Sequence, residues 1–534
     1  MSNKPRKRSA IALAFGTTIA LGTGLAGAAA PGTAKGPSTT TDPYVMPIDP
    51  TAVQITSLLT IDDPAPGAGY VVAGLLDGLG AFPDGSGGVT VLAAHEISSG
   101  GATRAHGFNG SFFSKHTVTP GTLAVSGSAD LMTSVDWSGG TPRAFSRFCS
   151  GDLSGPNQLF NTSSGKGFNG QLFFAGEETG LGGVALAADP ATGDAKVLTD
   201  LGQMSWENIV LADTRTSDVT LAIGNNDTST ANQNANFFYV GAKSNTGSKY
   251  DKAGLTGGQR FGFVVTGAST DAAFRTAFGK NSPQAWAPTT ALAASTGAAI
   301  QAELVTKGGF QMDRTEDGAF DPNNPNDYYF VTTGNGQTAA QLAKGGKGGL
   351  WKLSFTDRTN PALGGTLTLL ADGTEGAGTG AMFMPDNLTI DGAGHVLIQE
   401  DPGNTSYVAR IWAYDIATKQ LAPIATFDNR FTTGDPGFLT VDEESSGIIP
   451  APAALGANTF LFDAQVHGTG SKVSNAAAQI ELAQLLSMTV DFTKVFPAAP
   501  PAEVPEAPLS VLLPLTALAL GGAAFTVQRR RRTA

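Results

Sequence analysis

The sequence predicts an all-β protein, and a β-propeller in particular. Short apolar or alternating runs recur from residue 52 onward, separated by Gly, Asn and Asp turn formers. These runs are rich in Val, Phe, Tyr and Thr, whereas stretches with helical spacing are few. The two ends leave roughly 460 residues between them, which suits a propeller better than a sandwich.

Each expected strand is only a few residues long and is bounded at both ends by residues that favour turns. The clearest lie in residues 88–96, 171–178, 218–227, 236–243, 261–267, 327–333, 349–355, 366–372, 387–401 and 410–416. Residues 387–398 and 411–423 resemble blade units, with a strand, a polar turn and a second strand. Helices are expected only at residues 270–278, 291–306 and 474–486.

The N-terminus has the layout of a secretory signal peptide. Clustered Lys and Arg precede an apolar run that ends in small residues, and cleavage is expected near residues 28–30. Residues 1–30 are therefore assigned to the signal peptide, residues 31–50 to a flexible lead-in, and residues 51–496 to the propeller. This arrangement predicts an exported protein.

The C-terminus predicts contact with a membrane. A Pro/Ala linker at residues 497–508 leads to the tail, residues 509–534, which holds an apolar span and four terminal arginines. The sequence VPEAP before the span resembles bacterial sorting tails of the PEP type. In that resemblance Pro505 and Glu506 are recognised by a processing protease; a retained anchor is the alternative.

Composition restricts the possible partners and the source of stability. The formal net charge is −12, which argues against nucleic-acid binding and is compatible with multivalent cations. The chain has one cysteine, so an exported domain must be held together by core burial or by bound metals. We expect a monomer.

Acidic residues cluster at the ends of the expected strands, where a propeller gathers side chains around its channel. Like charges brought together need cations, and carboxylates and Asn oxygens suit Ca²⁺. Glu177 and Glu178 are adjacent, so one can bind a metal while the other supports the turn. Glu207 lies in an apolar run and needs a partner, whereas Asp227 reads equally well as a turn residue or a ligand. The clusters are His95-Glu96, Asp152, Glu177-Glu178, Glu207, Asp227, Glu316-Asp317, Asp386-Asn387, Glu400-Asp401 and Asp442-Glu443-Glu444.

The sequence Arg314-Thr315-Glu316-Asp317 indicates a phosphate site. Arg314 and Glu316 are two residues apart in an extended segment and therefore share a face. A guanidinium beside metal-binding carboxylates offers bidentate hydrogen bonds and charge neutralisation to a phosphoryl group. The alternative is an ordinary surface ion pair. No zinc-protease or serine-hydrolase motif is present in the sequence.

The lone cysteine, Cys149, can be a packing residue, a nucleophile or a metal ligand. Its neighbours Arg147 and Asp152 predict a polar setting in which a thiolate forms easily.

Six motifs in order resemble the PhoX-type alkaline phosphatase family of exported bacterial proteins. They are RFCSGDLSG, LFFAGEETG, LGQMSWENIV, RTEDGAFDP, MPDNLTIDGAGHVLI and VDEESSGI, and the resemblance runs from about residue 50 to 470. It implies a six-bladed propeller, a cofactor of Ca²⁺ and Fe³⁺, and hydrolysis of phosphate esters of small molecules.

The resemblance also implies roles for individual residues. Cys149 would bind iron, and the catalytic residues would be Arg314, which contacts phosphate, and Glu316. The other metal-site residues would be Glu177, Glu178, Glu207, Asp227, Glu316, Asp386 and Asn387. The chain departs from the family at Asn225-Asn226-Asp227, where it has one carboxylate fewer, and at RTED, where the family has proline after the arginine.

Two other functions remain open on the sequence alone. One is a non-catalytic, calcium-binding propeller on the cell surface or in the matrix. The other is a calcium-dependent propeller hydrolase acting on phytate or a lactone.

Overall fold

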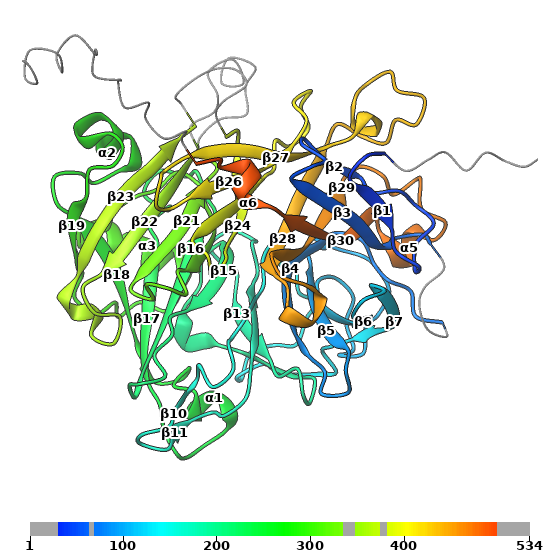
Figure 1. The fold of residues 1–534 in the computed structure, drawn as a ribbon. Coiled ribbons are helices and arrows are strands. Elements are labelled where there is room, and N and C mark those ends of the chain that lie inside the picture. Colours follow the sequence, from blue (N-terminus) through cyan, green and yellow to red (C-terminus); the bar gives the residue numbers. More distant parts are fainter. Residues whose placement is uncertain (1–29, 64–68, 335–347, 374–381, 499–534) are drawn as a thin grey trace, which may run out of the picture.

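The fold consists mainly of antiparallel sheets arranged around a central channel (Figure 1). The structure is a computed structural model and describes residues 30–63, 69–334, 348–373 and 382–498. Adjacent inner strands contact one another in a closed ring. The predicted all-β, six-bladed propeller is therefore confirmed.

Each blade places its first strand next to the channel and its last strand outside. Blade 1 contains β4 (Leu76–Pro83), β5 (Val89–His95), β6 (Phe113–Thr119) and β7 (Ala124–Asp130). Blade 2 contains β9 (Asp152–Leu153), β12 (Phe173–Gly176), β13 (Ala185–Ala188) and β14 (Asp194–Val197), with β8 (Ser134–Asp136) parallel to β14 at the outer edge. Between β9 and β12 lies a small hairpin of β10 (Phe160–Asn161) and β11 (Lys166–Gly167).

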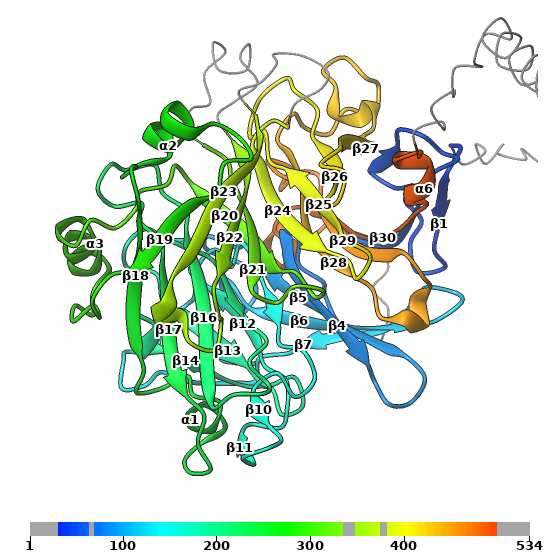
Figure 2. The same cartoon turned by 60° about the vertical axis from the view of Figure 1, so that its left-hand side comes forward.

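Blades 3 and 4 are joined into one nine-stranded sheet. Blade 3 contains β15 (Trp206–Leu211), β16 (Val219–Asn226), β17 (Phe237–Ala242) and β18 (Gln259–Val265). Blade 4 contains β20 (Thr315–Phe320), β21 (Asp327–Thr332), β22 (Gly349–Phe355) and β23 (Gly365–Asp372). The joining strand, β19 (Gln284–Pro288), pairs with β18 on one side and β23 on the other (Figure 2).

Blades 5 and 6 recruit strands from the N-terminus. Blade 5 contains β24 (Pro385–Ile390), β25 (His395–Glu400), β26 (Arg410–Asp415) and β27 (Leu421–Phe427), and adds β2 (Val45–Pro47). Blade 6 contains β28 (Glu443–Pro450), β29 (Thr459–Val466), β30 (Leu482–Val490) and β3 (Val53–Thr60), and adds β1 (Thr33–Lys35). Residues 31–50, expected to be a flexible lead-in, thus include two strands paired with the propeller.

Helices are short and lie outside the blades. The α-helices are α1 (Lys249–Lys252), α2 (Asp271–Phe278), α3 (Gly297–Thr306), α5 (Ala476–Gln479) and α6 (Phe492–Val495). The 3₁₀ turns are η1 (Thr199–Leu201), η2 (Pro361–Leu363), η3 (Asn429–Phe431) and η4 (Ala453–Leu455). The helix expected at 474–486 is only partly present, because residues from 482 onward pair as β30.

The core lies between neighbouring blades, which is why strands such as β29 are buried along their whole length. Between blades 3 and 4, Phe238 and Phe263 share one apolar cluster with Phe330 and Trp351. Such face-to-face packing fixes the blades and leaves the inner strand ends free to carry polar groups.

In the described part of the chain, no helix is both long and apolar enough to cross a bilayer. The expected signal peptide, the C-terminal span and the sorting residues Pro505 and Glu506 fall outside the described residues.

Candidate metal centre at the channel mouth

Five blades bring polar side chains to one mouth of the channel in the same way. The first residue of the inner strand pairs with the last residue of the next strand, so both strand ends lie at that mouth. The residue that follows each paired residue contributes a polar group. These residues are Asp77 and Glu96, Glu207 and Asp227, Glu316 and Thr333, Asp386 and Asp401, and Glu444 and His467.

Blade 2 supplies Cys149 from the segment before β9 and Glu178 from the turn after β12. The Cys149 Sγ donates to Glu178 Oε2 at 3.0 Å. This blade therefore adds a thiol to a site otherwise composed mostly of carboxylates.

The backbone turns sharply into the site in four blades. Leu75, Arg147, Arg314 and Met384 have left-handed φ values of 53°, 50°, 52° and 50°. Each of them lies two residues before a residue that lines the site. Non-glycine residues adopt this conformation at a cost, and such positions are often found at functional sites.

These side chains surround a cavity that is partly open to solvent and has about 280 Å³ of space free of atoms. Its lining contains nine carboxylates, two arginines and one thiol: Asp77, Glu96, Glu178, Glu207, Asp227, Glu316, Asp386, Asp401, Glu444, Arg147, Arg314 and Cys149. Two guanidinium groups cannot balance nine carboxylates, so protons or bound cations must compensate the remainder.

The pKa values reflect this excess of negative charge. Burial and the neighbouring Asp227 raise the pKa of Glu178 to about 8, and burial and Asp401 raise that of Glu444 to about 7. Burial, together with other carboxylates, also raises the pKa values of Asp77, Glu207, Glu316 and Asp386.

Cys149 differs from the expectation of an easily formed thiolate. Burial raises the pKa of its thiol, and Glu96 and Glu178 raise it further, outweighing the opposite effect of Arg147. Without a cation in the cavity the thiol is therefore protonated.

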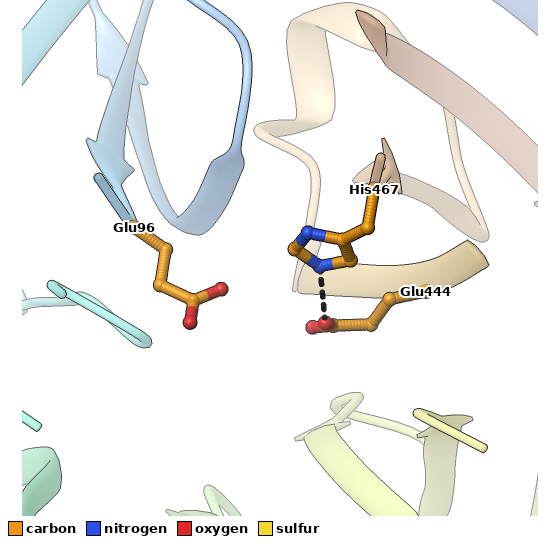
Figure 3. Close-up of side chains that lie close together, drawn as sticks. All are labelled: Glu96, Glu444 and His467. Atoms are coloured by element: carbon orange, nitrogen blue, oxygen red, sulfur yellow. Dashed lines mark hydrogen bonds and ion pairs between the residues drawn. The ribbon is translucent and has the colours of Figure 1, made fainter. Parts of the chain in front are cut away.

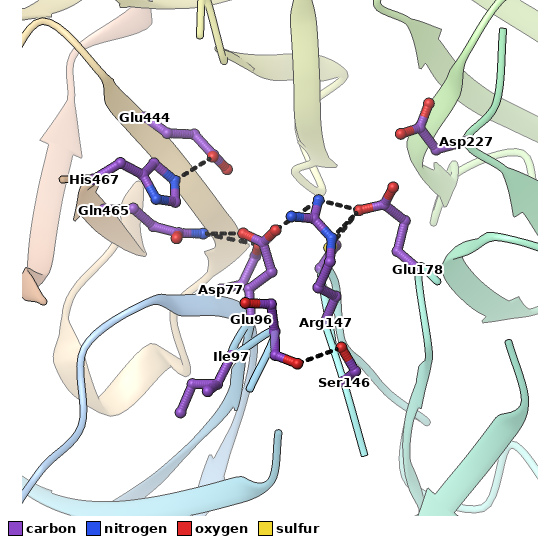
Figure 4. A network of polar contacts seen from close by, with 12 residues as sticks. Asp77, Glu96, Ile97, Ser146, Arg147, Glu178, Asp227, Glu444, Gln465 and His467 are labelled. Atoms are coloured by element: carbon purple, nitrogen blue, oxygen red, sulfur yellow. Dashed lines mark hydrogen bonds and ion pairs between the residues drawn. The ribbon is translucent and has the colours of Figure 1, made fainter. Parts of the chain in front are cut away.

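Arg147 lies between two acidic residues of the cavity wall (Figure 4). Its Nη2 is 2.8 Å from Glu96 Oε1, and its Nε donates to Glu178 Oε2 at 2.8 Å. Its side chain keeps 42% of its surface exposed. This arginine therefore offers a partly open positive group at the rim.

Arg314 forms a second such group on blades 3 and 4. Its Nε and Nη2 donate to the two oxygens of Asp227 at 2.8 and 3.1 Å, and its Nη2 is 3.2 Å from Glu316 Oε1. Thr333 Oγ1 donates to the same oxygen of Glu316 at 2.5 Å. These contacts fix the guanidinium plane at the cavity wall.

Three groups of side chains have the spacing of cation ligands. The ligand atoms of each group lie within 4.8 Å of one another. The groups are Glu207, Glu316 and Asp386; Glu96, Cys149 and Glu178; and Glu96, Glu444 and His467.

Unpartnered oxygens support this interpretation. Glu207 Oε1 and the side-chain oxygens of Asn208 and Asn387 are buried without a hydrogen-bond partner. Buried polar atoms normally have partners, so the unpartnered oxygen of Glu207, which lines the cavity, fits a hard cation such as Ca²⁺. The thiol beside two carboxylates fits a transition metal such as iron, which binds sulfur, rather than Ca²⁺, which binds oxygen.

Most of the residues named from the sequence come together here. Cys149, Glu178, Glu207, Asp227, Arg314, Glu316 and Asp386 all line the cavity.

The other two residues lie behind the cavity wall. Glu177 is fully buried and accepts from Arg143 Nη1 and Nη2 at 2.6 and 2.5 Å. Asn387 Nδ2 donates to Asp77 Oδ1 at 3.4 Å. Of the adjacent glutamates, therefore, Glu178 faces the cavity and Glu177 holds the turn.

Sequence reasoning did not identify Asp77, Arg147 or His467 as site residues. A usable signal exists: Leu76-Asp77-Gly78 has the same position in its blade as Trp206-Glu207-Asn208 and Pro385-Asp386-Asn387. The Asp-Gly pair resembles an ordinary turn, which hides this correspondence.

The sequence model of one protein family, described as alkaline phosphatase PhoX, matches residues 187–436 of this chain. The match begins within β13 and ends beyond β27. The resemblance inferred from the six motifs is thus confirmed over this part of the chain. None of the curated protein sequences matches the chain.

Similar solved structures are distant. A gluconolactonase, XC5397 from Xanthomonas campestris, has 10% identity and a TM-score of 0.31, covering 80% of this chain and 98% of its own. The GH93 α-L-arabinofuranosidase of Fusarium graminearum has 8% identity and a TM-score of 0.35, covering 81% and 96%. An oligogalacturonate lyase from Vibrio parahaemolyticus has 8% identity and a TM-score of 0.28, covering 79% and 99%. Because these sequence identities and TM-scores are low, the three structures say nothing about the activity of this chain.

Proposed function

We propose, from the PhoX alkaline phosphatase match over residues 187–436, that this chain is a metal-dependent phosphatase acting on phosphate monoesters. The observation that carries the proposal is the cavity itself, which places two arginines on the rim of a dense carboxylate cluster. Substrates would be phosphate esters of small molecules.

The arginines hold the phosphate. Arg314 is kept in place by Asp227 and Glu316, so its guanidinium can bind two phosphate oxygens without first being ordered. Arg147 approaches from blades 1 and 2 and is partly exposed. Both groups can stabilise the charge that develops on the phosphoryl oxygens.

The carboxylates alone would repel a phosphate dianion. The Glu207 group would hold Ca²⁺ and the Cys149 group Fe³⁺, which accounts for the unpartnered oxygen of Glu207 and for the thiol. When bound, these ions would neutralise the phosphate and polarise its P–O bonds. The role of the chain is to hold them beside the arginines at fixed distances.

The protein is proposed to act outside the cytoplasm. Support comes from the signal-peptide layout of residues 1–30 and from the apolar span and arginines of residues 509–534. The tail would place the enzyme at a membrane at least transiently, and the Pro505-Glu506 pair would be read by a sorting protease. Mass spectrometry of the mature protein from cell fractions would give both termini.

The test is turnover of p-nitrophenyl phosphate by the purified chain with and without added Ca²⁺ and Fe³⁺. We expect activity that chelation abolishes and both metals restore. Arg314→Ala should lower kcat by about 100-fold or more, as for loss of a fixed transition-state donor. The matched control is Arg215→Ala, because Arg215 is an exposed arginine paired with Asp213 outside the cavity.

Metal content separates this proposal from a non-catalytic calcium-binding propeller. Elemental analysis should find iron in the native protein and a loss of iron in Cys149→Ala. Calcium without iron, together with no turnover by the metal-loaded wild type, would reject the phosphatase. Preferential turnover of phytate or a lactone would instead favour another calcium-dependent hydrolase.

A further inference from the structure

We propose that Glu96, Glu444 and His467 form a third cation-binding group, at the edge of the cavity, that takes a divalent transition-metal ion. The three side chains come from blades 1 and 6 and face a common space (Figure 3). Their ligand atoms lie within 4.8 Å of one another. This binding site does not depend on phosphatase activity.

The imidazole is oriented from behind by a third glutamate. His467 Nδ1 is 3.5 Å from Glu481 Oε2, while Nε2 is 3.4 Å from Glu444 Oε2. Glu481 is itself held, because its Oε1 accepts from the Gly468 backbone N–H at 3.1 Å. A metal-binding histidine usually directs its other ring nitrogen to a carboxylate in this way.

An unpartnered group beside the three side chains also indicates a ligand. Gln465 is fully buried, and its Nε2 donates to Asp77 Oδ2 at 3.0 Å and to Glu96 Oε2 at 3.1 Å. Its Oε1 has no partner. Gln465 and His467 are two residues apart at the end of β29 and share a face. The Nε2 of Gln465 already reaches Glu96, so a cation bound by Glu96 would also give the Oε1 of Gln465 a partner.

The chemistry of the donors favours a transition metal over Ca²⁺. Imidazole is a good ligand for transition-metal ions such as Fe²⁺, Ni²⁺ and Zn²⁺, whereas Ca²⁺ takes six to eight oxygens. The imidazole side chain keeps 26% of its surface exposed, which gives an ion access from solvent. Glu96 has two oxygens and can contribute to this group and to the Cys149 group at once.

The experiment is pulsed EPR of the full chain, stripped of metals and then given one equivalent of Mn²⁺ in the presence of excess Ca²⁺. We expect nitrogen coupling from a directly bound imidazole. The chain has five histidines, and His467 is the one that the structure places in a ligand group. His467→Gln should remove the coupling and weaken Mn²⁺ binding at least tenfold.

Two further variants control the result. His395→Gln alters an imidazole with a single carboxylate partner, Asp391 at 2.8 Å, and should leave the signal unchanged. Glu481→Gln keeps the His467 ligand but removes the carboxylate that orients its imidazole. It should weaken Mn²⁺ binding by about 10- to 100-fold while the nitrogen coupling persists. Circular dichroism checks that each variant is folded.

Two outcomes would overturn the site: no nitrogen coupling in wild type, or the same coupling in folded His467→Gln. The proposal and the phosphatase can fail independently. Coupling without turnover rejects only the enzyme, whereas turnover without coupling rejects only this site.

Discussion

At the scale of single residues, Asp317 organises the site without lining its cavity. It accepts from Asn208 Nδ2 at 2.6 Å, the Gly318 N–H at 2.7 Å, and Ser150 Oγ and the Leu388 N–H at 3.3 Å. These donors adjoin Cys149, Glu207 and Asn387 in sequence. One buried carboxylate therefore links the inner segments of four blades directly behind the candidate ligands.

Asp317→Asn should lower both stability and metal affinity. The amide keeps one acceptor oxygen and turns an NH₂ group toward N–H donors, which costs about 1–3 kcal/mol. Urea unfolding and calorimetric titration with Ca²⁺ would measure the two effects. Asp321→Asn is the control at the other end of the same segment, where the carboxylate accepts from Asn323 N–H at 2.8 Å. Equal effects of the two variants would refute the linking role.

His116 predicts a pH effect that is separate from the cavity. It lies in a buried chain of hydrogen bonds, with Ser114 Oγ at 3.0 Å from Nε2 and Ser128 Oγ at 2.8 Å from Nδ1. Burial lowers the pKa of His116 to about 4 from an ordinary 6.5. The imidazole is therefore neutral in the folded protein at neutral pH.

The folded state binds fewer protons at His116 than the unfolded state does between pH 6.5 and 4. Stability should therefore fall as the pH falls through this window, by about 3 kcal/mol from this residue. His116→Gln should show a smaller loss than wild type in urea unfolding at several pH values. Parallel curves for the two proteins would contradict the assignment.

At the scale of elements, the register between strands decides which residues form the site. In five blades the first residue of the inner strand pairs with the last residue of the next strand, and this register brings a carboxylate from each inner strand to the mouth of the channel. In four of these blades a β-bulge follows, for example between Trp206 and Ile209. Bulges redirect side chains, and here they separate the residue facing the cavity from the one behind it.

Gly78 shows how closely the inner segments approach one another. A Cβ at this position would lie 1.6 Å from the Gly151 nitrogen, so no side chain fits between blades 1 and 2. Gly78→Ala must push back the segment that carries Cys149, and should cost about 3 kcal/mol or more.

Gly127→Ala in β7 is the matched control, because its added methyl group would meet no atom within 4 Å. It should be neutral or slightly stabilising, since Ala restricts the unfolded chain. Thermal unfolding and iron content would compare the two variants. A Gly78→Ala protein as stable and as iron-rich as wild type would contradict the proposed close contact.

The elements themselves were largely predictable, because turn formers and apolar alternation are local signals. Glu207 stood out as a carboxylate in an apolar run, Glu316 through its spacing from Arg314, and Asp386 as part of an acidic cluster and through the family resemblance. The choice between Glu177 and Glu178 was not predictable, since it depends on which of them Arg143 reaches. Asp77 and His467 were missed because their role arises only when distant blades meet. The strand β2 was missed because it pairs with β27 near the other end of the chain, and β1 because it is a three-residue edge strand beside β3.

At the scale of the whole molecule, the excess of negative charge couples folding to cations. Nine carboxylates share one cavity in a chain of net charge −12. Removing cations leaves these groups to repel one another or to take up protons, and both weaken the folded state at neutral pH.

Ca²⁺ should therefore raise the unfolding temperature of the chelator-treated protein. At a concentration one hundred times the Kd the gain is about 2.7 kcal/mol for one site. Mg²⁺ should give a smaller effect because it loses its hydration water reluctantly. Differential scanning calorimetry with NaCl at matched ionic strength is the measurement. An unfolding temperature that Ca²⁺ leaves unchanged would argue against a cation site.

The closure of blade 6 has a consequence for how the protein is made. Its outer strand β3 is synthesised early, but its partner β30 comes near the end, and the hydrogen-bonded residues Thr60 and Gln484 are 424 positions apart. The ring cannot be completed until almost the whole propeller has left the ribosome. The two ends of the fold therefore stay unpaired until late in synthesis, a delay that would suit the export proposed above.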